Sequence, residues 1–325
     1  MQAVTGEQFH GEIRPAGAPA LLKGIAKDWP AVEAAGEGDA RFASYLIECG
    51  PTKKVKYLHG APEEGGRFFY NARMTGFNFE TRQVSLPGFL DLLMAAEEQT
   101  PAPALAVQSE VIPEFLPRFA AENRIDFLSD VPPRIWIGNR IRVAAHYDLK
   151  ENFAVCVSGR RRFTLFPPDA IADLYPGPFE LTPAGTPVSM VDLASPDLDA
   201  FPRFPQAMAR AQMAELEPGD ALYIPYGWWH AVESLAPMST LVNYWWSDAD
   251  SALAGPYDAL LHAVAAFRHL PPEQREVWRG MVDHYVFEAN GPPAAHLPPH
   301  ARGLMADGSP ALFARFGQML KQLLR

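Results

Sequence analysis

Cysteine is scarce in this chain, and long apolar runs are missing. The 325 residues include two cysteines, Cys49 and Cys156, which are too few for a disulfide framework or a cysteine-rich zinc module. No apolar run approaches the roughly 20 residues that a membrane-spanning helix needs. The first residues, MQAVTGEQFHGEIRP, lack the apolar segment of a secretory signal, and neither end carries a lipidation signal. We therefore expect a cytoplasmic protein with no membrane partner.

A surplus of basic residues is also missing. Lys and Arg number 28 against 38 Asp and Glu, so the formal net charge is −10. Nucleic-acid-binding proteins usually carry a basic surplus, and a general DNA or RNA partner is therefore disfavoured. The composition is otherwise that of a globular protein, and a chain of this length can bury a large core without disulfides.

Short strand-like segments dominate the middle of the chain. β-Branched and aromatic residues bounded by Gly, Pro and Asp predict strands at residues 134–138, 141–145, 153–157, 162–166, 221–225 and 240–246. Ser158-Gly159 is predicted to be the turn of a hairpin that joins residues 152–157 to residues 160–166. Several short strands with turn signals indicate a barrel or a sandwich.

Mixed elements precede this region and helices follow it. Strands are predicted at residues 19–22, 55–58 and 67–70, and helices at residues 40–49 and 85–96. From about residue 251, apolar stripes at helical spacing predict three helices, with a Pro-rich linker at residues 291–299 and a Ser309-Pro310 start for the last helix. The chain is thus expected to begin with both strands and helices, to continue with strands, and to end with helices.

Three side chains in the β-rich region could share one metal ion. His146 and Asp148 are two positions apart on a predicted strand, so they face the same way while Tyr147 turns away. His230 follows a tight turn, a short strand and the pair Trp228-Trp229, which suits a wall that keeps water from a reactive centre. Each motif alone is more often structural, but the combination is a stronger signal. Two histidines and one carboxylate with open positions are the ligands of non-haem Fe(II) that activates O₂.

The same stretch of chain resembles a known family. The resemblance is to the cupin-like, JmjC-type Fe(II)/2-oxoglutarate dioxygenases, and among them to the asparaginyl hydroxylases. It covers residues 130–247 closely and rests on His146-Tyr147-Asp148, Asn152-Phe153-Ala154, residues 159–168, Leu174-Tyr175-Pro176-Gly177-Pro178, residues 218–225, Trp228-Trp229-His230 and Val242-Asn243-Tyr244-Trp245.

The resemblance implies a mainly β fold with helices. Its centre would be a double-stranded β-helix, or jelly-roll barrel, with N-terminal α/β elements and a C-terminal helical tail. We expect residues 1–250 to form the barrel with its N-terminal extension, with a barrel core at about residues 105–247. Residues 251–325 would form a helical region that could join two copies into a homodimer.

The resemblance also implies an activity and a set of site residues. His146, Asp148 and His230 match the family's Fe(II) ligands, and 2-oxoglutarate would be the co-substrate. Arg161 matches the basic residue that anchors the distal carboxylate of 2-oxoglutarate, while Arg160 and Arg162 alternate to the other face. Two amides, Asn152 and Asn243, match positions that line the pocket. The implied reaction is hydroxylation of a C–H bond in a protein side chain or a small molecule, with release of succinate and CO₂.

Two positions depart from the pattern of the asparaginyl hydroxylases. A Thr that touches the co-substrate is Val143 here, and a Tyr in the same role falls near Ala106. The co-substrate could instead contact Gln108, Ser109, Tyr57 or Tyr70. The sequence is also compatible with an acidic co-substrate other than 2-oxoglutarate.

Two other classes of function stay open beside the oxygenase. One is a cupin that binds a metal or ligand without turnover, as a sensor or scaffold. The other is a zinc or nickel hydrolase or isomerase on the same barrel, because these metals bind the same ligands tightly. Four aromatic residues would either shape the pocket or belong to the barrel core: Phe153, Trp136, Tyr147 and Trp228.

Overall fold

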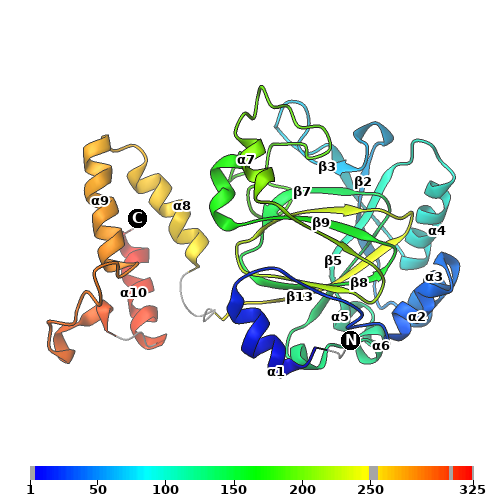
Figure 1. Cartoon of the computed structure of the whole chain (residues 1–325), viewed down its shortest axis with the longest axis horizontal. Helices are drawn as coiled ribbons and strands as arrows, with labels where there is room; N and C mark the ends of the chain where they lie inside the picture. Colours follow the sequence, from blue (N-terminus) through cyan, green and yellow to red (C-terminus); the bar gives the residue numbers. More distant parts are fainter. Residues whose placement is uncertain (1–3, 249–254, 307–309, 324–325) are drawn as a thin grey trace. The chain divides into compact units, whose positions relative to one another are not determined.

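Thirteen strands in two facing sheets form the main body of the described residues, 4–248, 255–306 and 310–323, in this computed structural model (Figure 1). The strands are β1 Ala20–Leu22, β2 Val55–Gly60, β3 Arg67–Phe68, β4 Phe79–Val84, β5 Ala104–Val111, β6 Pro133–Gly138, β7 Arg142–Tyr147, β8 Glu151–Ser158, β9 Arg161–Phe166, β10 Gln212–Leu216, β11 Ala221–Ile224, β12 Trp229–Ser234 and β13 Ser239–Trp246. The larger sheet has the order β1-β11-β8-β13-β6-β5-β2-β4, and the smaller sheet has the order β10-β9-β12-β7-β3. This double-sheet barrel confirms the predicted mainly β jelly-roll fold with helices.

Helices cover the outer face of the larger sheet. The helices before the tail are α1 Gly6–Gln8, α2 Pro30–Gly36, α3 Asp39–Glu48, α4 Leu86–Glu97, α5 Ile112–Phe115, α6 Pro117–Glu122 and α7 Phe204–Ala209. Of these, α7 packs instead on the outer face of the smaller sheet. Strand β8 shows how the sequence separates the two faces. Its large residues Phe153, Val155 and Val157 pack in the core beneath the helices, whereas Ala154 and Cys156 belong to the cluster inside the barrel. Small inward residues leave room for a cavity between the sheets.

The six strands predicted in the middle of the chain are present, but the predicted hairpin is wrong. Gly159 does form a turn, with φ at +67°. However, β8 pairs with β11 and β13 in the larger sheet, whereas β9 pairs with β10 and β12 in the smaller sheet. The turn therefore carries the chain from one sheet to the other. A turn signal fixes a change of direction, but it does not specify which strand becomes the partner.

The chain divides into two compact units, Met1–Trp246 and Ser247–Arg325. The second unit contains α8 Pro256–Phe267, α9 Pro272–Tyr285 and α10 Pro310–Leu323, as the apolar stripes predict. The rings of Phe267 and Trp278 stack at 5.0 Å between centroids and join α8 to α9. Ser309, the predicted cap of the last helix, lies outside the described residues. Within the described ranges, the helices are all too short or too polar to cross a bilayer.

Candidate metal and co-substrate site

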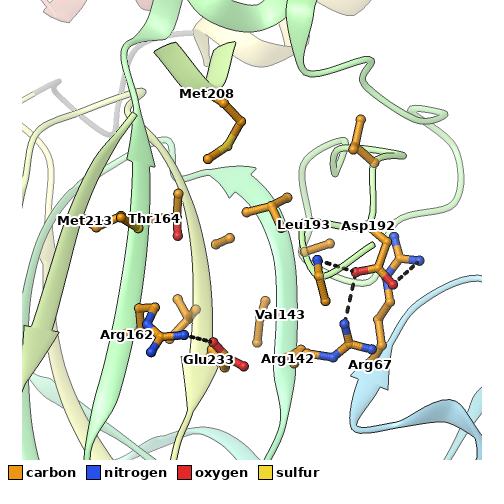
Figure 2. A pocket seen from close by; sticks show the side chains of 15 residues that line it. Arg67, Arg142, Val143, Arg162, Thr164, Asp192, Leu193, Met208, Met213 and Glu233 are labelled. Carbon is orange, nitrogen blue, oxygen red and sulfur yellow. Dashed lines mark hydrogen bonds and ion pairs between the residues drawn. The ribbon is translucent and has the colours of Figure 1, made fainter. Parts of the chain in front are cut away.

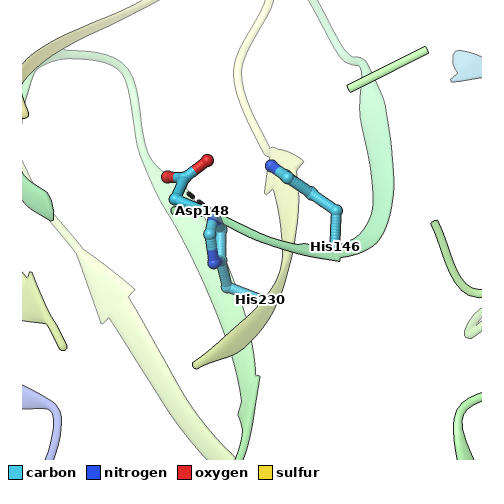
Figure 3. A group of neighbouring side chains, drawn as sticks. All are labelled: His146, Asp148 and His230. Carbon is cyan, nitrogen blue, oxygen red and sulfur yellow. Dashed lines mark ion pairs between the residues drawn. The ribbon is translucent and has the colours of Figure 1, made fainter. Parts of the chain in front are cut away.

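The two candidate histidines face each other across neighbouring strands. In the antiparallel pair β7 and β12, His146 lies directly opposite His230. Residues in that relation project from the same face of a sheet. Their rings are 4.3 Å apart between centroids, and Figure 3 shows both directed toward Asp148. Tyr147 and Trp229 occupy the alternate positions and pack against each other in the cluster on the opposite face.

A β-bulge and two backbone carbonyl groups orient the imidazoles. In β7, Ala144 and Ala145 lie opposite the single residue Ala231, which shifts the register next to the histidines. The Nδ1 atom of His146 lies 3.0 Å from the carbonyl oxygen of Ala144. The Nδ1 atom of His230 lies 3.1 Å from the Trp228 carbonyl oxygen. Donation from each Nδ1–H leaves the Nε2 lone pair for a metal ion.

Asp148 completes the cluster from the turn after β7. Its backbone carbonyl accepts a hydrogen bond from the Gly227 N–H at 3.2 Å, which ties this turn to the one before β12. Its Oδ2 atom lies 3.7 Å from the His230 Nε2 atom. One ligand atom from each of His146, Asp148 and His230 lies within 4.8 Å of the others. That spread fits one divalent ion with bonds of about 2.0–2.2 Å.

Burial keeps the His230 imidazole neutral. The side chain is 4% exposed, and its burial, together with the neighbouring His146, lowers the pKa to about 4 despite the opposing Asp148 carboxylate. A neutral imidazole is the form that ligates a metal. The spacing of the three donors and the neutral His230 imidazole therefore fit a divalent transition metal.

A cavity of about 110 Å³ surrounds these ligand-type side chains. All six site residues predicted from the sequence line it: His146, Asp148, His230, Arg161, Asn152 and Asn243. The other lining residues are mostly apolar or aromatic: Gln108, Trp136, Val143, Phe163, Pro183, Ala184, Val232, Leu241 and Trp245. The structure thus brings together residues from β5, β6, β7, β8, β9, β12 and β13.

Arg161 is a buried cation in the wall of this cavity. The residue is 4% exposed, whereas the Arg160 and Arg162 side chains are 57% and 41% exposed, which confirms the expected alternation. Its Nε–H donates to Ser239 Oγ at 3.0 Å, and its Nη2–H donates to the Ser239 carbonyl oxygen at 3.3 Å. Burial lowers its pKa to about 10, so the guanidinium stays charged at neutral pH. Within the described part of the chain, no carboxylate is paired with it.

The two asparagines form a chain of amides that ends at Asp148. The Asn243 Nδ2–H donates to Asn152 Oδ1 at 2.7 Å, and the Asn152 Nδ2–H donates to Asp148 Oδ2 at 3.0 Å. These bonds fix the carboxylate toward the histidines, and each amide nitrogen keeps a second N–H. Among the described residues, three buried polar atoms of the lining have no partner: Asn243 Oδ1, Trp136 Nε1 and Trp245 Nε1.

The aromatic wall differs from the sequence-based expectation. Trp136 and Trp245 line the cavity, with ring centroids 5.8 Å apart. Trp229 instead packs on the outer face of the smaller sheet, and Trp228 packs beside the barrel cluster outside the cavity lining. Phe153 belongs to the core beneath the helices. Trp245 was missed, although its position two residues after Asn243 places it on the same face of β13.

Gln108, Ser109, Tyr57 and Tyr70 were the expected alternative contacts of the co-substrate. Among them, Gln108 alone lines the cavity. It lies at a bulge in β5, where Gln108 and Ser109 face the single residue Trp136. Ser109 has φ at +57°, and its hydroxyl and carbonyl oxygens accept hydrogen bonds from Arg134. Tyr57 and Tyr70 pack in separate clusters, as does Ala106, whereas Val143 reaches the cavity.

Comparison with known proteins agrees with the cupin-like fold described above. Residues 6–252 match the family described as "Cupin-like domain", and the chain belongs to that family. The resemblance to JmjC-type cupins is confirmed by the relatives that match.

Three relatives illustrate the range of these matches. Lysine-specific demethylase JMJ31 of Arabidopsis thaliana is 38% identical over 105 residues, which cover 32% of this chain and 19% of that protein. HSPB1-associated protein 1 of Mus musculus is 36% identical over 130 residues, covering 39% and 26%. The tRNA wybutosine-synthesizing protein 5 of Mus musculus is 28% identical over 269 residues, covering 77% and 78%. The match thus spans about a quarter or less of the length of the first two relatives.

Proposed function

We propose that this protein is an Fe(II)- and 2-oxoglutarate-dependent dioxygenase that hydroxylates a C–H bond and releases succinate and CO₂. His146, Asp148 and His230 would hold the iron. Support comes from family membership and from the fit of their ligand atoms to one divalent ion.

The observation that carries the proposal is the buried, uncompensated charge of Arg161 in the same cavity. A buried cation without an anionic partner is costly, so the site favours an anionic ligand. The planar guanidinium can pair with a carboxylate through two hydrogen bonds. A dicarboxylate such as 2-oxoglutarate could place one carboxylate on Arg161 while its 2-oxo acid end reaches the metal ligands, since both line one cavity.

The side chains of this protein would position the reactants and exclude water. Bound iron and 2-oxoglutarate supply O₂ activation and the oxidation of the C–H bond. Asn152 and Asn243 would hold Asp148 in its ligating orientation and offer their remaining N–H groups to the co-substrate. Trp136 and Trp245 would form the apolar wall of the site.

The substrate would be a protein side chain or a small molecule. The names of the relatives mention lysine demethylation and tRNA wybutosine synthesis, so they point to no single substrate. We further propose a cytoplasmic protein that forms a homodimer through residues 251–325. Two free, buried cysteines accord with a reducing compartment.

Succinate formation tests the activity. The purified chain, loaded anaerobically with Fe(II) and then given 2-oxoglutarate and O₂, should produce succinate well above a control without iron, and N-oxalylglycine should inhibit it. Metal-dependent binding of 2-oxoglutarate without succinate would indicate a sensor or scaffold instead. Hydrolase or isomerase turnover with Zn²⁺ or Ni²⁺, and none with Fe(II), would also contradict the oxygenase.

A further inference from the structure

A second cavity lies on the reverse side of the strands that carry the metal-ligand residues. It measures about 320 Å³, and we call it the outer groove. Thr164 of β9 and Ala231 of β12 contribute to its floor, and both alternate with residues that face the barrel interior. Figure 2 shows Met208 above the strands and Leu193 to one side. The smaller sheet therefore divides the outer groove from the cavity around His146, and Val143 and Val232 border both.

The charges on one side of the outer groove are balanced. Arg162 pairs with Glu215 at 2.7 Å and with Glu233 at 3.0 Å, and Arg160 lies 3.9 Å from Glu215. Two guanidinium groups thus face two carboxylates. This side has no excess charge for a ligand to compensate.

The opposite side carries one excess positive charge. Arg67 and Arg142 share the single carboxylate of Asp192, at 3.6 Å and 3.0 Å respectively, as Figure 2 shows. Arg142 also donates from Nε to the Gly65 carbonyl oxygen at 3.2 Å. Both arginines line the outer groove. Within the lining of this side of the outer groove, two guanidinium groups and one carboxylate sum to a net charge of about +1, while Glu63 and Glu64 line only the adjoining hollow.

Arg67 has an unused hydrogen-bond donor. Its side chain is 19% exposed, and its guanidinium lies 3.6 Å from the centroid of the Phe69 ring. The Nη2 atom is buried and, within the described ranges, has no hydrogen-bond partner. A buried N–H of a charged group without an acceptor is costly. Burial lowers the pKa of Arg67 despite the opposing charge of Asp192, and the charge of Arg142 lowers it further. An anion beside Arg67 and Arg142 would balance their excess charge.

A neighbouring hollow on the other side of Arg67 is a poorer place for that anion. It measures about 540 Å³ and is also lined by Glu63 and Glu64. These carboxylates would repel a second anion. The outer groove instead adds apolar side chains to the arginine pair, among them Val191, Leu193 and Met208.

We propose that the outer groove binds an organic monocarboxylate, with its carboxylate on Arg67 and Arg142 and its aliphatic part against Leu193 and Met208. One negative charge matches the single excess positive charge. A guanidinium pairs with a carboxylate in a planar, bidentate manner. The volume lies within the range of small-molecule sites. The proposal is independent of the oxygenase activity.

Hexanoate is a suitable probe, with hexanol as the uncharged ligand of equal chain length. In calorimetric titrations of the full chain, hexanoate should bind and hexanol should bind at least about tenfold more weakly. Arg67→Gln should weaken hexanoate binding about tenfold or more, and Arg67→Lys should have an intermediate effect because it keeps the charge but loses the planar pair. The matched control Arg160→Gln lies outside the groove lining and should change the affinity less than about twofold.

Two further variants keep the result interpretable. Arg142→Gln tests the same pair from β7 if Arg67→Gln lowers the unfolding temperature. Arg161→Ala removes the cation of the other cavity, so unchanged hexanoate binding by that variant assigns the ligand to the outer groove. Equal binding of hexanol and hexanoate, equal effects of the Arg67 and Arg160 substitutions, absence of hexanoate binding, or its loss in Arg161→Ala would each overturn the proposal.

Discussion

His146 and Asp148 are partly exposed at the end of β7, so either can be removed without opening the core. We expect His146→Ala or Asp148→Ala to abolish iron-dependent succinate formation, because two ligands hold Fe(II) poorly. Thermal unfolding should stay close to that of the unsubstituted protein. Tyr147→Phe is the matched control, since Tyr147 lies between the two and turns away. Turnover at the original rate in either alanine variant would refute the ligand assignment.

The contrast between Arg161 and Arg160 gives a second test at the same scale. Arg161→Ala should raise the KM for 2-oxoglutarate by about tenfold or more, because a charge-assisted, bidentate pair is lost in a buried site. Arg160→Ala should change this KM less than about twofold, since the Arg160 side chain is 57% exposed. Steady-state kinetics with varied 2-oxoglutarate measure both values. Equal effects would place the co-substrate anchor elsewhere.

Single residues were predictable where strand alternation determines their direction. The two-residue period points His146 into the barrel and Arg161 opposite to its neighbours, whereas Asp148 lies in the turn just after β7 and is held there by Gly227. It fails for Gln108, whose direction depends on the bulge at Ser109. A bulge inserts one residue into the alternation, and nothing in the local sequence of β5 marks it. The hydrogen bonds from Arg134 that accompany this bulge come from another strand.

The turn between β8 and β9 gives a prediction at the scale of elements. In Gly159→Ala, the new Cβ would lie 2.5 Å from the Met238 carbonyl oxygen at a φ of +67°. We expect a loss of about 2–3 kcal/mol in the free energy of unfolding, measured by urea denaturation.

The control for this substitution is Gly17→Ala. Gly17 has a similar φ of +61° with open space around its Cβ position, so about 1 kcal/mol should be lost. Similar losses in both variants would show that backbone conformation alone, without the clash, sets the effect.

Strand positions were easier to predict than strand partners. The β-branched and aromatic residues of β6, β8 and β13 predict these strands locally. The pairing of β8 with β11 and β13 depends on contacts between segments far apart in the chain. The strand β10 was missed because Gln212–Leu216, at the edge of the smaller sheet, lacks strict alternation: Met213 and Ala214 are adjacent. Local patterns contain little information on such edges.

At the scale of the whole molecule, the oligomeric state tests the proposed homodimer. In α9, Val277 is 57% exposed and Met281 is 43% exposed, and Phe287 beyond the helix is 71% exposed. If these side chains join two copies, Val277→Glu should shift the protein from dimer to monomer in light scattering after gel filtration. The control Gln274→Glu adds the same charge on the same helix and should leave the dimer intact. A monomeric unsubstituted protein would contradict the homodimer.

The bulge opposite Ala231 has a consequence for how this chain can evolve. A single codon gained or lost inside β12 would turn every following side chain to the other surface of the sheet, unless the neighbouring strand absorbed it. Val232 would then leave the cavity, and a change just before position 230 would carry His230 outside as well. Lineages descended from this protein should therefore tolerate length changes in β12 only in pairs of residues.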